Sequence, residues 1–203
     1  MNQKGFFVCI EGLDKSGKTT QSVLLVEALC KKGFDAVYTT EPSDREIGRF
    51  IRKYVLQRKD RVPTVIEALL FAADRADHIV YEVKPMLEKG RIVVSDRYVY
   101  SSLAYQGAAG LSLNWIKEIN NQALKPDLAI YIDVPVEVLT QRYRSTKSVM
   151  EKLDTQKKVE EIYLKLVQEK ELIRINGKRS MEEAAKDIQD MVLGRLKKLD
   201  SSG

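Results

Sequence analysis

The sequence predicts an α/β fold in which a five-stranded parallel sheet is flanked by helices. Two observations favour this fold. Short apolar runs alternate along the chain with longer stretches of helical periodicity, a pattern typical of a doubly wound sheet. Some of the short runs are apolar throughout, such as Ile92-Val93-Val94, as in strands buried on both faces. Because no repeat or linker interrupts the chain, we expect a single domain over residues 1–203.

The short apolar runs are the expected strands, and the longer periodic segments between them are the expected helices. The strand candidates span residues 6–10, 36–40, 91–95, 128–133 and 172–175. The helix candidates span residues 18–32, 45–56, 64–88, 114–124, 136–143, 154–168 and 181–198. Gly33 and Gly90 each follow a helix, at the position where a helix end often requires a positive φ. In an open parallel sheet, ligands bind beyond the carboxyl ends of the strands, so functional residues are expected there.

The composition is that of an ordinary globular chain and excludes several classes of protein. The 203 residues include 34 Lys and Arg, 29 Asp and Glu and one histidine, with a net charge of +5. The basic residues are scattered among acids, which argues against a nucleic-acid partner. No apolar run approaches the roughly 20 residues of a membrane span, and the N-terminus lacks a secretory pattern, so we expect a cytoplasmic protein. Two cysteines are too few for a disulfide framework.

A phosphate-binding loop follows the first expected strand. Its pattern is G-x-x-x-x-G-K-[ST], and it lies between a strand and a helix, which is the context that this motif requires. The glycines let backbone N–H groups face phosphate oxygens, and the helix N-terminus adds positive partial charge. Lys18 can reach the β- and γ-phosphates, and the Thr19 hydroxyl can ligate Mg²⁺. The sequence therefore predicts the three-layer P-loop NTPase fold, with ATP phosphates held by Gly12, Leu13, Asp14, Lys15, Ser16, Gly17, Lys18, Thr19 and Thr20.

The rest of the chain favours a small kinase over other P-loop classes. A GTPase would need a guanine-reading N-K-x-D motif, which the sequence lacks, and Asp96 is followed by Arg97-Tyr98 rather than by x-Gly. A motor ATPase would be longer and would carry an acidic base after its second motif. The class that remains phosphorylates a small molecule.

Four further segments show which small kinases the chain resembles. The run Asp96 to Gly107 reads D-R-Y-V-Y-S-S-L-A-Y-Q-G, and it is accompanied by Glu41-Pro42, by Leu69 to Arg75 and by Lys125 to Leu128. With the P-loop, these segments resemble the thymidylate kinase family over nearly the whole chain. The resemblance implies transfer of the ATP γ-phosphoryl group to dTMP, giving dTDP for dTTP synthesis, with Mg²⁺ as cofactor. A deoxynucleoside kinase or another nucleoside monophosphate kinase is the alternative; a deoxynucleoside kinase would be expected to show Glu-Arg-Ser in place of the D-R-Y motif.

The same resemblance implies a set of residues for dTMP. Phe71 would stack on the thymine, and Arg75, four residues on and on the same helix face, would donate to the base edge. Tyr105 would lie beside the sugar C2′ and disfavour a ribose hydroxyl. Ser102 and Gln106 would meet the pyrimidine edge. Asp14 would accept from the 3′-hydroxyl.

The resemblance also implies how the phosphates are handled. Arg52 would bind the acceptor phosphate, although Arg45 and Arg49 are close enough in sequence to compete for that role. Arg97 would lie between the two phosphate groups. Asp96 would reach Mg²⁺ through water, together with Thr19. Because Mg²⁺ keeps several waters, the lack of an acidic cage is no objection.

A mobile lid is expected at about residues 142–154, where Arg142 would cover the adenine ring. The lid departs from the common R-x-[DE] pattern, since the chain reads Lys152-Leu153-Asp154, and Thr40 stands where an arginine often precedes Glu-Pro. The expected catalytic residues are Lys18, Arg97 and Lys15. Because Lys15 lies in a short loop, we expect it to contribute more to catalysis than the lid residues Arg144 and Lys147.

Finally, the resemblance implies a homodimer packed through helices near the acceptor side. The expected helix 64–88 carries apolar side chains that suit such an interface but would equally suit the core: Ile66, Leu69, Leu70, Ala73 and Val80.

Overall fold

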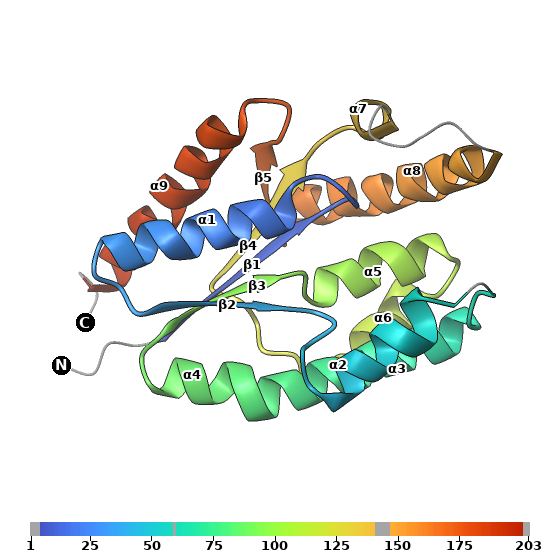
Figure 1. Cartoon of the computed structure of the whole chain (residues 1–203), viewed down its shortest axis with the longest axis horizontal. Coiled ribbons are helices and arrows are strands. Elements are labelled where there is room, and N and C mark those ends of the chain that lie inside the picture. The colour runs from blue at the N-terminus through green and yellow to red at the C-terminus, as the bar shows by residue number, and fades with distance from the viewer. Residues whose placement is uncertain (1–4, 59, 141–146, 201–203) are drawn as a thin grey trace.

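A computed structural model describes residues 5–58, 60–140 and 147–200 of the chain. The described residues form a three-layer α/β fold around a five-stranded parallel sheet (Figure 1). The strand order is β2-β3-β1-β4-β5. The strands are β1 (Phe6–Gly12), β2 (Ala36–Thr40), β3 (Ile92–Asp96), β4 (Leu128–Asp133) and β5 (Ile173–Asn176). The predicted fold class is thereby confirmed.

Helices cover both faces of the sheet. On one face, α1 (Lys18–Lys31) packs against α9 (Met181–Asp200), which also contacts β5 (Figure 1). The other face is covered by the remaining long helices, among which α5 (Val99–Ala108) contacts both α3 (Thr64–His78) and α8 (Lys147–Gln168). The shorter elements are α2 (Glu46–Ile51), α4 (Lys84–Glu88), α6 (Leu113–Ile119), α7 (Val136–Thr140) and the π-helical turns η1 (Arg52–Leu56) and η2 (Ile79–Val83).

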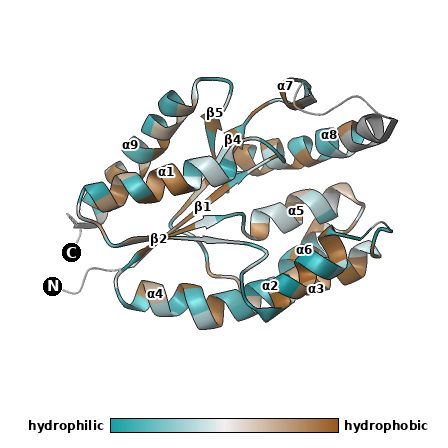
Figure 2. Ribbon diagram, viewed as in Figure 1, coloured by the Kyte–Doolittle hydropathy of each residue, from teal (hydrophilic) through white to brown (hydrophobic). Residues whose placement is uncertain are grey.

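The core sits on the three central strands. All residues of β1, β3 and β4 are buried, and hydrophobic colour runs through these strands while the helices show both colours (Figure 2). The parallel register pairs Val8 with Val94 on one side of β1 and with Leu128 on the other. This register brings the carboxyl ends of β1 and β3 together, which places the P-loop next to the D-R-Y turn. None of the helices in the described ranges is both long and apolar enough to cross a membrane.

The sequence analysis was wrong about one helix and about the bounds of some others. It missed α5 altogether, because the segment begins with Val, Tyr and two Ser, which are weak helix formers; packing between α3 and α8 decides its conformation. The expected helix 64–88 is present as α3, η2 and α4 in series, and the expected helix 45–56 as α2 and η1. Helix α8 begins at Lys147, seven residues before the expected start at Asp154, and α6 ends earlier than expected, at Ile119.

Candidate functional site

The loop after β1 has the geometry of a phosphate cradle. Gly17 caps α1 with φ 95°, a left-handed conformation that favours glycine. At Gly12 the restriction is space, since a Cβ there would lie 2.5 Å from Ser16 Oγ and 3.0 Å from the Ile132 carbonyl oxygen. Both glycines are thus required by the path of the backbone. The loop feeds directly into the N-terminus of α1, where N–H groups and the helix dipole favour an anion.

Lys18 is held within this cradle. Its side chain is buried, and its ammonium group donates to the Leu13 carbonyl oxygen at 2.6 Å. Burial and the nearby Arg97 lower the pKa of Lys18 to about 7, against the opposing charges of Asp14 and Asp96. A bound phosphate would raise this pKa again, because a neighbouring anion favours the charged ammonium.

The expected metal ligands lie together between the P-loop and the end of β3. The Thr19 hydroxyl donates to Asp96 Oδ2 at 2.5 Å. The other carboxylate oxygen, Asp96 Oδ1, is buried and has no protein hydrogen-bond partner. An unpartnered buried carboxylate oxygen beside a P-loop hydroxyl fits a magnesium ion or one of its waters. Among the described residues, no group of three or more acidic, histidine or cysteine side chains could hold a metal by itself, so water and nucleotide phosphates would have to complete the coordination.

A buried carboxylate that sequence analysis gave no role fixes the D-R-Y turn. Glu11, at the end of β1, accepts hydrogen bonds from the Tyr98 amide at 2.7 Å, from the Ser101 amide and hydroxyl at 3.2 and 2.6 Å, and from the Tyr163 hydroxyl at 2.8 Å. Burial nevertheless raises the pKa of Glu11 above its usual range. Its only sequence signal is an acid at the end of an otherwise apolar strand. Glu11 thereby ties the first strand to the start of α5.

A cavity of about 360 Å³ opens next to the P-loop on the α3 and α5 side. Seven of the eight residues expected to bind dTMP line it, namely Asp14, Phe71, Arg75, Arg97, Ser102, Tyr105 and Gln106. Residues that were not assigned to the acceptor also line it, among them Glu41, Leu56 and Glu67. The structure therefore brings together side chains that lie almost 100 positions apart in the sequence.

Arg97 connects this cavity to the P-loop. Its guanidinium donates to Asp14 and to the Ser101 hydroxyl, the latter at 3.1 Å, and lies 5.2 Å from the centre of the Tyr105 ring. The backbone of Arg97 has φ 72°, which is uncommon for a residue with a Cβ and costs about 1–2 kcal/mol. Strained backbone of this kind is found preferentially at functional sites.

The Asp14 carboxylate accepts hydrogen bonds from both Arg97 and Tyr105. The Tyr105 hydroxyl donates to Asp14 Oδ1 at 3.0 Å, beside the Arg97 contact. Burial raises the pKa of Asp14, but the charges of Arg97 and Lys18 outweigh it and hold this pKa below its usual range. Asp14 is thus a carboxylate at neutral pH.

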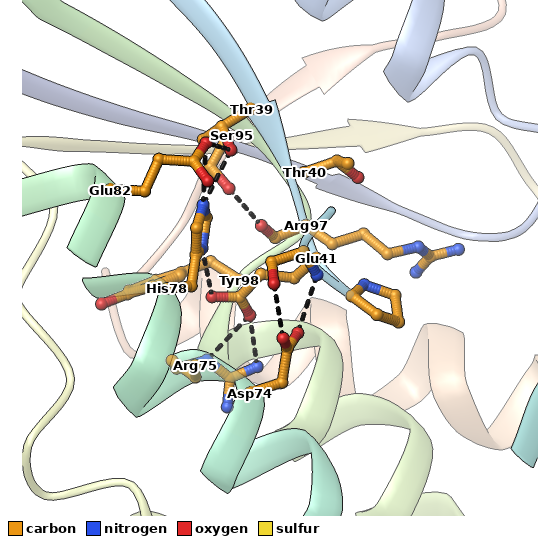
Figure 3. A network of polar contacts seen from close by, with 12 residues as sticks. Thr39, Thr40, Glu41, Asp74, Arg75, His78, Glu82, Ser95, Arg97 and Tyr98 are labelled. Carbon is orange, nitrogen blue, oxygen red and sulfur yellow. Dashed lines mark hydrogen bonds and ion pairs between the residues drawn. The ribbon is translucent and has the colours of Figure 1, made fainter. Parts of the chain in front are cut away.

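The residues expected to meet the base are hydrogen-bonded to two acids that also line the cavity. The Gln106 amide donates to Glu67 Oε1 at 2.8 Å, and the Gln106 carbonyl oxygen is buried without a partner. Arg75, fully buried on α3, donates to Glu41 Oε2 at 2.9 Å (Figure 3). It also donates to the Ser102 hydroxyl at 3.2 Å. Glu67 and Glu41 are far in sequence from the residues that they bind, so no local sequence pattern predicts these contacts and the sequence analysis missed their roles.

Arg52 is the expected dTMP residue that does not line the cavity. Its guanidinium donates to the carbonyl oxygens of Pro42 and Ser43, and Pro42 is itself a lining residue. The two competing arginines are engaged elsewhere, since Arg45 pairs with Asp77 and Arg49 donates to the Asp44 carbonyl oxygen. Of the three arginines, Arg52 is therefore the one bound to the backbone of the cavity wall.

The remaining expected residues lie in the P-loop and around the lid. Lys15 is exposed in the P-loop with φ 67°, and Thr20 is exposed on α1. Arg142 and Arg144 lie outside the described residues, while Lys147 is the first residue of α8. The described part of the expected lid is thus the beginning of a helix.

Comparison with known proteins places this site in a family. A family model described as thymidylate kinase matches residues 10–188. A probable thymidylate kinase of Pyrococcus abyssi is 47% identical over 201 residues, which cover 95% of this chain and 98% of that protein. One from Thermococcus gammatolerans is 46% identical over 199 residues, with 93% and 96% covered, and one from Methanocaldococcus jannaschii is 44% identical over 194 residues, with 95% and 96% covered. Since each match extends over most of both chains, this chain belongs to the thymidylate kinase family.

Proposed function

We propose that this protein transfers the γ-phosphoryl group of ATP to dTMP, giving dTDP and ADP. The observation that carries the proposal is the position of the cavity, which shares Asp14 and Arg97 with the P-loop region. A nucleotide in the cavity and a triphosphate on the P-loop would meet at these two residues. Membership of the thymidylate kinase family supports dTMP as the acceptor, and no observation favours the alternative small kinases.

The reaction needs positioned cations more than it needs a base. A phosphate monoester has a second pKa of about 6, so the acceptor phosphate is already largely a dianion at neutral pH. The barrier lies in bringing two anions together, and catalysis rests on positioning and on positive charge around the transferred group. Lys18 and Arg97 would supply this charge. Their contacts with the P-loop residues Leu13 and Asp14 support the assignment.

A magnesium ion fits the residues at the end of β3. Thr19 and Asp96 would hold it, the latter through its unpartnered Oδ1 and water. The ion would supply positive charge on the β- and γ-phosphate oxygens of ATP.

The acceptor is recognised by the cavity wall. Phe71 offers a ring for the thymine, and Arg75, Ser102 and Gln106 offer polar groups to its edge. Arg52, bound to the carbonyl oxygens of Pro42 and Ser43 in the cavity wall, would bind the acceptor phosphate. The lid at about residues 142–154 would bring Arg142 over the adenine, and residues 1–203 would act as one domain.

The thiols of Cys9 and Cys30 are free, which is usual in a reducing compartment and supports a cytoplasmic location.

The function is tested by a coupled assay with Mg·ATP and a panel of nucleoside monophosphates. We expect dTMP to be the best substrate and its ribose counterpart to be used much less well, because Tyr105 lines the cavity beside Asp14. Absence of dTMP turnover, with activity on another acceptor, would overturn the proposal.

Tyr105→Ala provides the matched control for the sugar. It should narrow the preference for the deoxyribose form, whereas Tyr105→Phe, which keeps the ring and removes only the hydroxyl contact to Asp14, should retain the preference. Equal use of both sugars by the unmodified protein would show that Tyr105 does not crowd C2′.

The outer face of α3 and η2 supports a homodimer. Ile66, Leu69 and Val80 are 43%, 47% and 55% exposed, so they do not belong to the core of the single chain. A second copy covering this face would remove them from water. Light scattering is expected to give about twice the 23.2 kDa of one chain, and Leu69→Glu should lower that mass. A mass of one chain at micromolar concentration would contradict the proposal.

A further inference from the structure

The chain's single histidine lies directly behind the acceptor cavity. His78 is fully buried at the C-terminal end of α3. Its Nε2 lies 2.7 Å from the Thr39 hydroxyl, and its Nδ1 lies 3.3 Å from Glu41 Oε1 (Figure 3). His78 is not among the residues that line the cavity, whereas Glu41 is. Any influence of His78 on the acceptor must therefore act through Glu41.

The hydrogen bonds around His78 require both ring nitrogens to carry a proton. The Thr39 hydroxyl donates its one proton to Glu82 Oε1 at 2.7 Å, so its oxygen accepts from Nε2–H. A carboxylate only accepts, so the contact with Glu41 requires Nδ1–H. His78 is therefore an imidazolium between two carboxylates. Burial lowers its pKa, but Glu41 and Glu82 outweigh burial and raise the pKa to about 9.

Glu41 is shared between this imidazolium and Arg75. Its Oε2 accepts from Arg75 Nε at 2.9 Å and lies 2.7 Å from the second guanidinium nitrogen. Arg75, Glu41 and His78 are 2%, 3% and 0% exposed, so solvent screens their charges little. Arg75 also donates to Asn120 and to Ser102, which together fix its guanidinium. Glu41 thus sits between two cations, one of which faces the acceptor.

The side chains that line the cavity carry an excess of negative charge, which the His78 imidazolium helps to offset. Among the described residues that line the cavity, three are acids and two are arginines: Asp14, Glu41, Glu67, Arg75 and Arg97. The acceptor itself is a dianion. A cation directly behind Glu41 offsets the excess of negative charge and leaves the Arg75 guanidinium available to the nucleotide.

The protonation states of the other ionisable groups near His78 bear on any titration of this histidine. Glu82 has a lowered pKa because of hydrogen bonds from His78 and Thr39. Burial raises the pKa values of Cys9 and Tyr98, so both stay neutral. Burial also raises the pKa of Asp74, which accepts two hydrogen bonds from Ser43, whereas the hydrogen bond to Asp77 raises the pKa of Arg45, which stays a cation.

We propose that His78 is a positioning residue for the acceptor nucleotide: its imidazolium shares the Glu41 carboxylate with Arg75 and so holds the guanidinium and the local charge in the state that binds a nucleoside monophosphate. The proposal rests on the proposed function, since it takes dTMP as the acceptor. Loss of the His78 proton weakens acceptor binding and leaves phosphoryl transfer itself unchanged.

The first test is the pH dependence of the KM for dTMP at saturating Mg·ATP, from about pH 7 to about pH 10. In the unmodified protein KM should rise about tenfold through the pKa of His78, with kcat changed by no more than about twofold. His78→Gln should show the raised KM already at neutral pH and no further rise from this group. Because the thymine N–H also ionises in alkali, the relevant quantity is the difference in KM between the two proteins at each pH.

Glu82→Gln is the matched control. Glu82 is not among the cavity-lining residues, and removing its charge should lower the pKa of His78, so the rise in KM should move to lower pH while KM at neutral pH stays normal. A normal KM in His78→Gln at neutral pH, with the same alkaline rise as in the unmodified protein, would overturn the inference. Absence of dTMP turnover by the unmodified protein would instead overturn the proposed function.

The second test does not depend on activity or on a folded His78 variant. Because the chain has one histidine, its imidazole NMR signals are unambiguous. Titration of the full chain should place the pKa at about 9, and dTMP should raise it, because binding linkage is reciprocal. A histidine that titrates near 6.5, the value of an unperturbed imidazole, or that does not respond to dTMP, would refute the positioning role.

Discussion

Replacement of Arg97 by alanine is expected to lower kcat by about 10³-fold or more, the size of effect associated with an arginine that stabilises a phosphoryl-transfer transition state. The structure holds this side chain between the P-loop and the cavity, with one contact to the P-loop through Asp14 and one to α5 through Ser101. The strained backbone at φ 72° is the same for alanine, which also carries a Cβ, so the substitution does not relieve it. The loss should therefore report the guanidinium.

The measurement is steady-state kinetics with both substrates at saturation. Arg97→Lys should recover only part of the rate, because an ammonium lacks the planar fork of a guanidinium. Thermal unfolding and the affinity for Mg·ATP serve as controls for folding and for the donor site. A kcat close to normal in Arg97→Ala would contradict the placement of Arg97 between the phosphates.

Replacement of Lys15 by alanine is expected to lower kcat by about 10²-fold, with little change in nucleotide affinity. Lys15 has φ 67° and belongs to the same short P-loop motif as Lys18. A charge fixed in a short loop loses less conformational entropy on reaching the transition state than one on a segment that must close. The smaller effect than at Arg97 follows because lysine is a less well matched phosphate clamp.

Two lid variants provide the comparison for Lys15. Arg144→Ala and Lys147→Ala are expected to retain most of the kcat, with folding checked in each. If Arg144→Ala is the crippled variant and Lys15→Ala is nearly normal, the lid supplies the extra cation and the assignment to the P-loop is wrong.

The sequence by itself determined the features that depend on neighbouring residues. The P-loop is recognisable because its function resides in the spacing of glycines, Lys18 and Thr19 within eight positions. The three central strands are recognisable because burial on both faces demands continuous apolar runs. Phe71 and Arg75 could be paired because four residues bring two side chains to one face of a helix.

The tertiary structure alone decided which buried polar groups meet. Glu11 and Tyr163 are 152 residues apart, Glu41 and His78 are 37 apart, and Gln106 and Glu67 are 39 apart. No local period links such residues, so the sequence does not show which acid meets which partner. Helix α5 likewise depends on the tertiary structure. Its first residues are weak helix formers, and its packing against α3 and α8 supplies the stabilisation. A buried charge is tolerated only where the fold delivers its partners, so these contacts are fixed by the arrangement of strands and helices and are not written in any one segment of the chain.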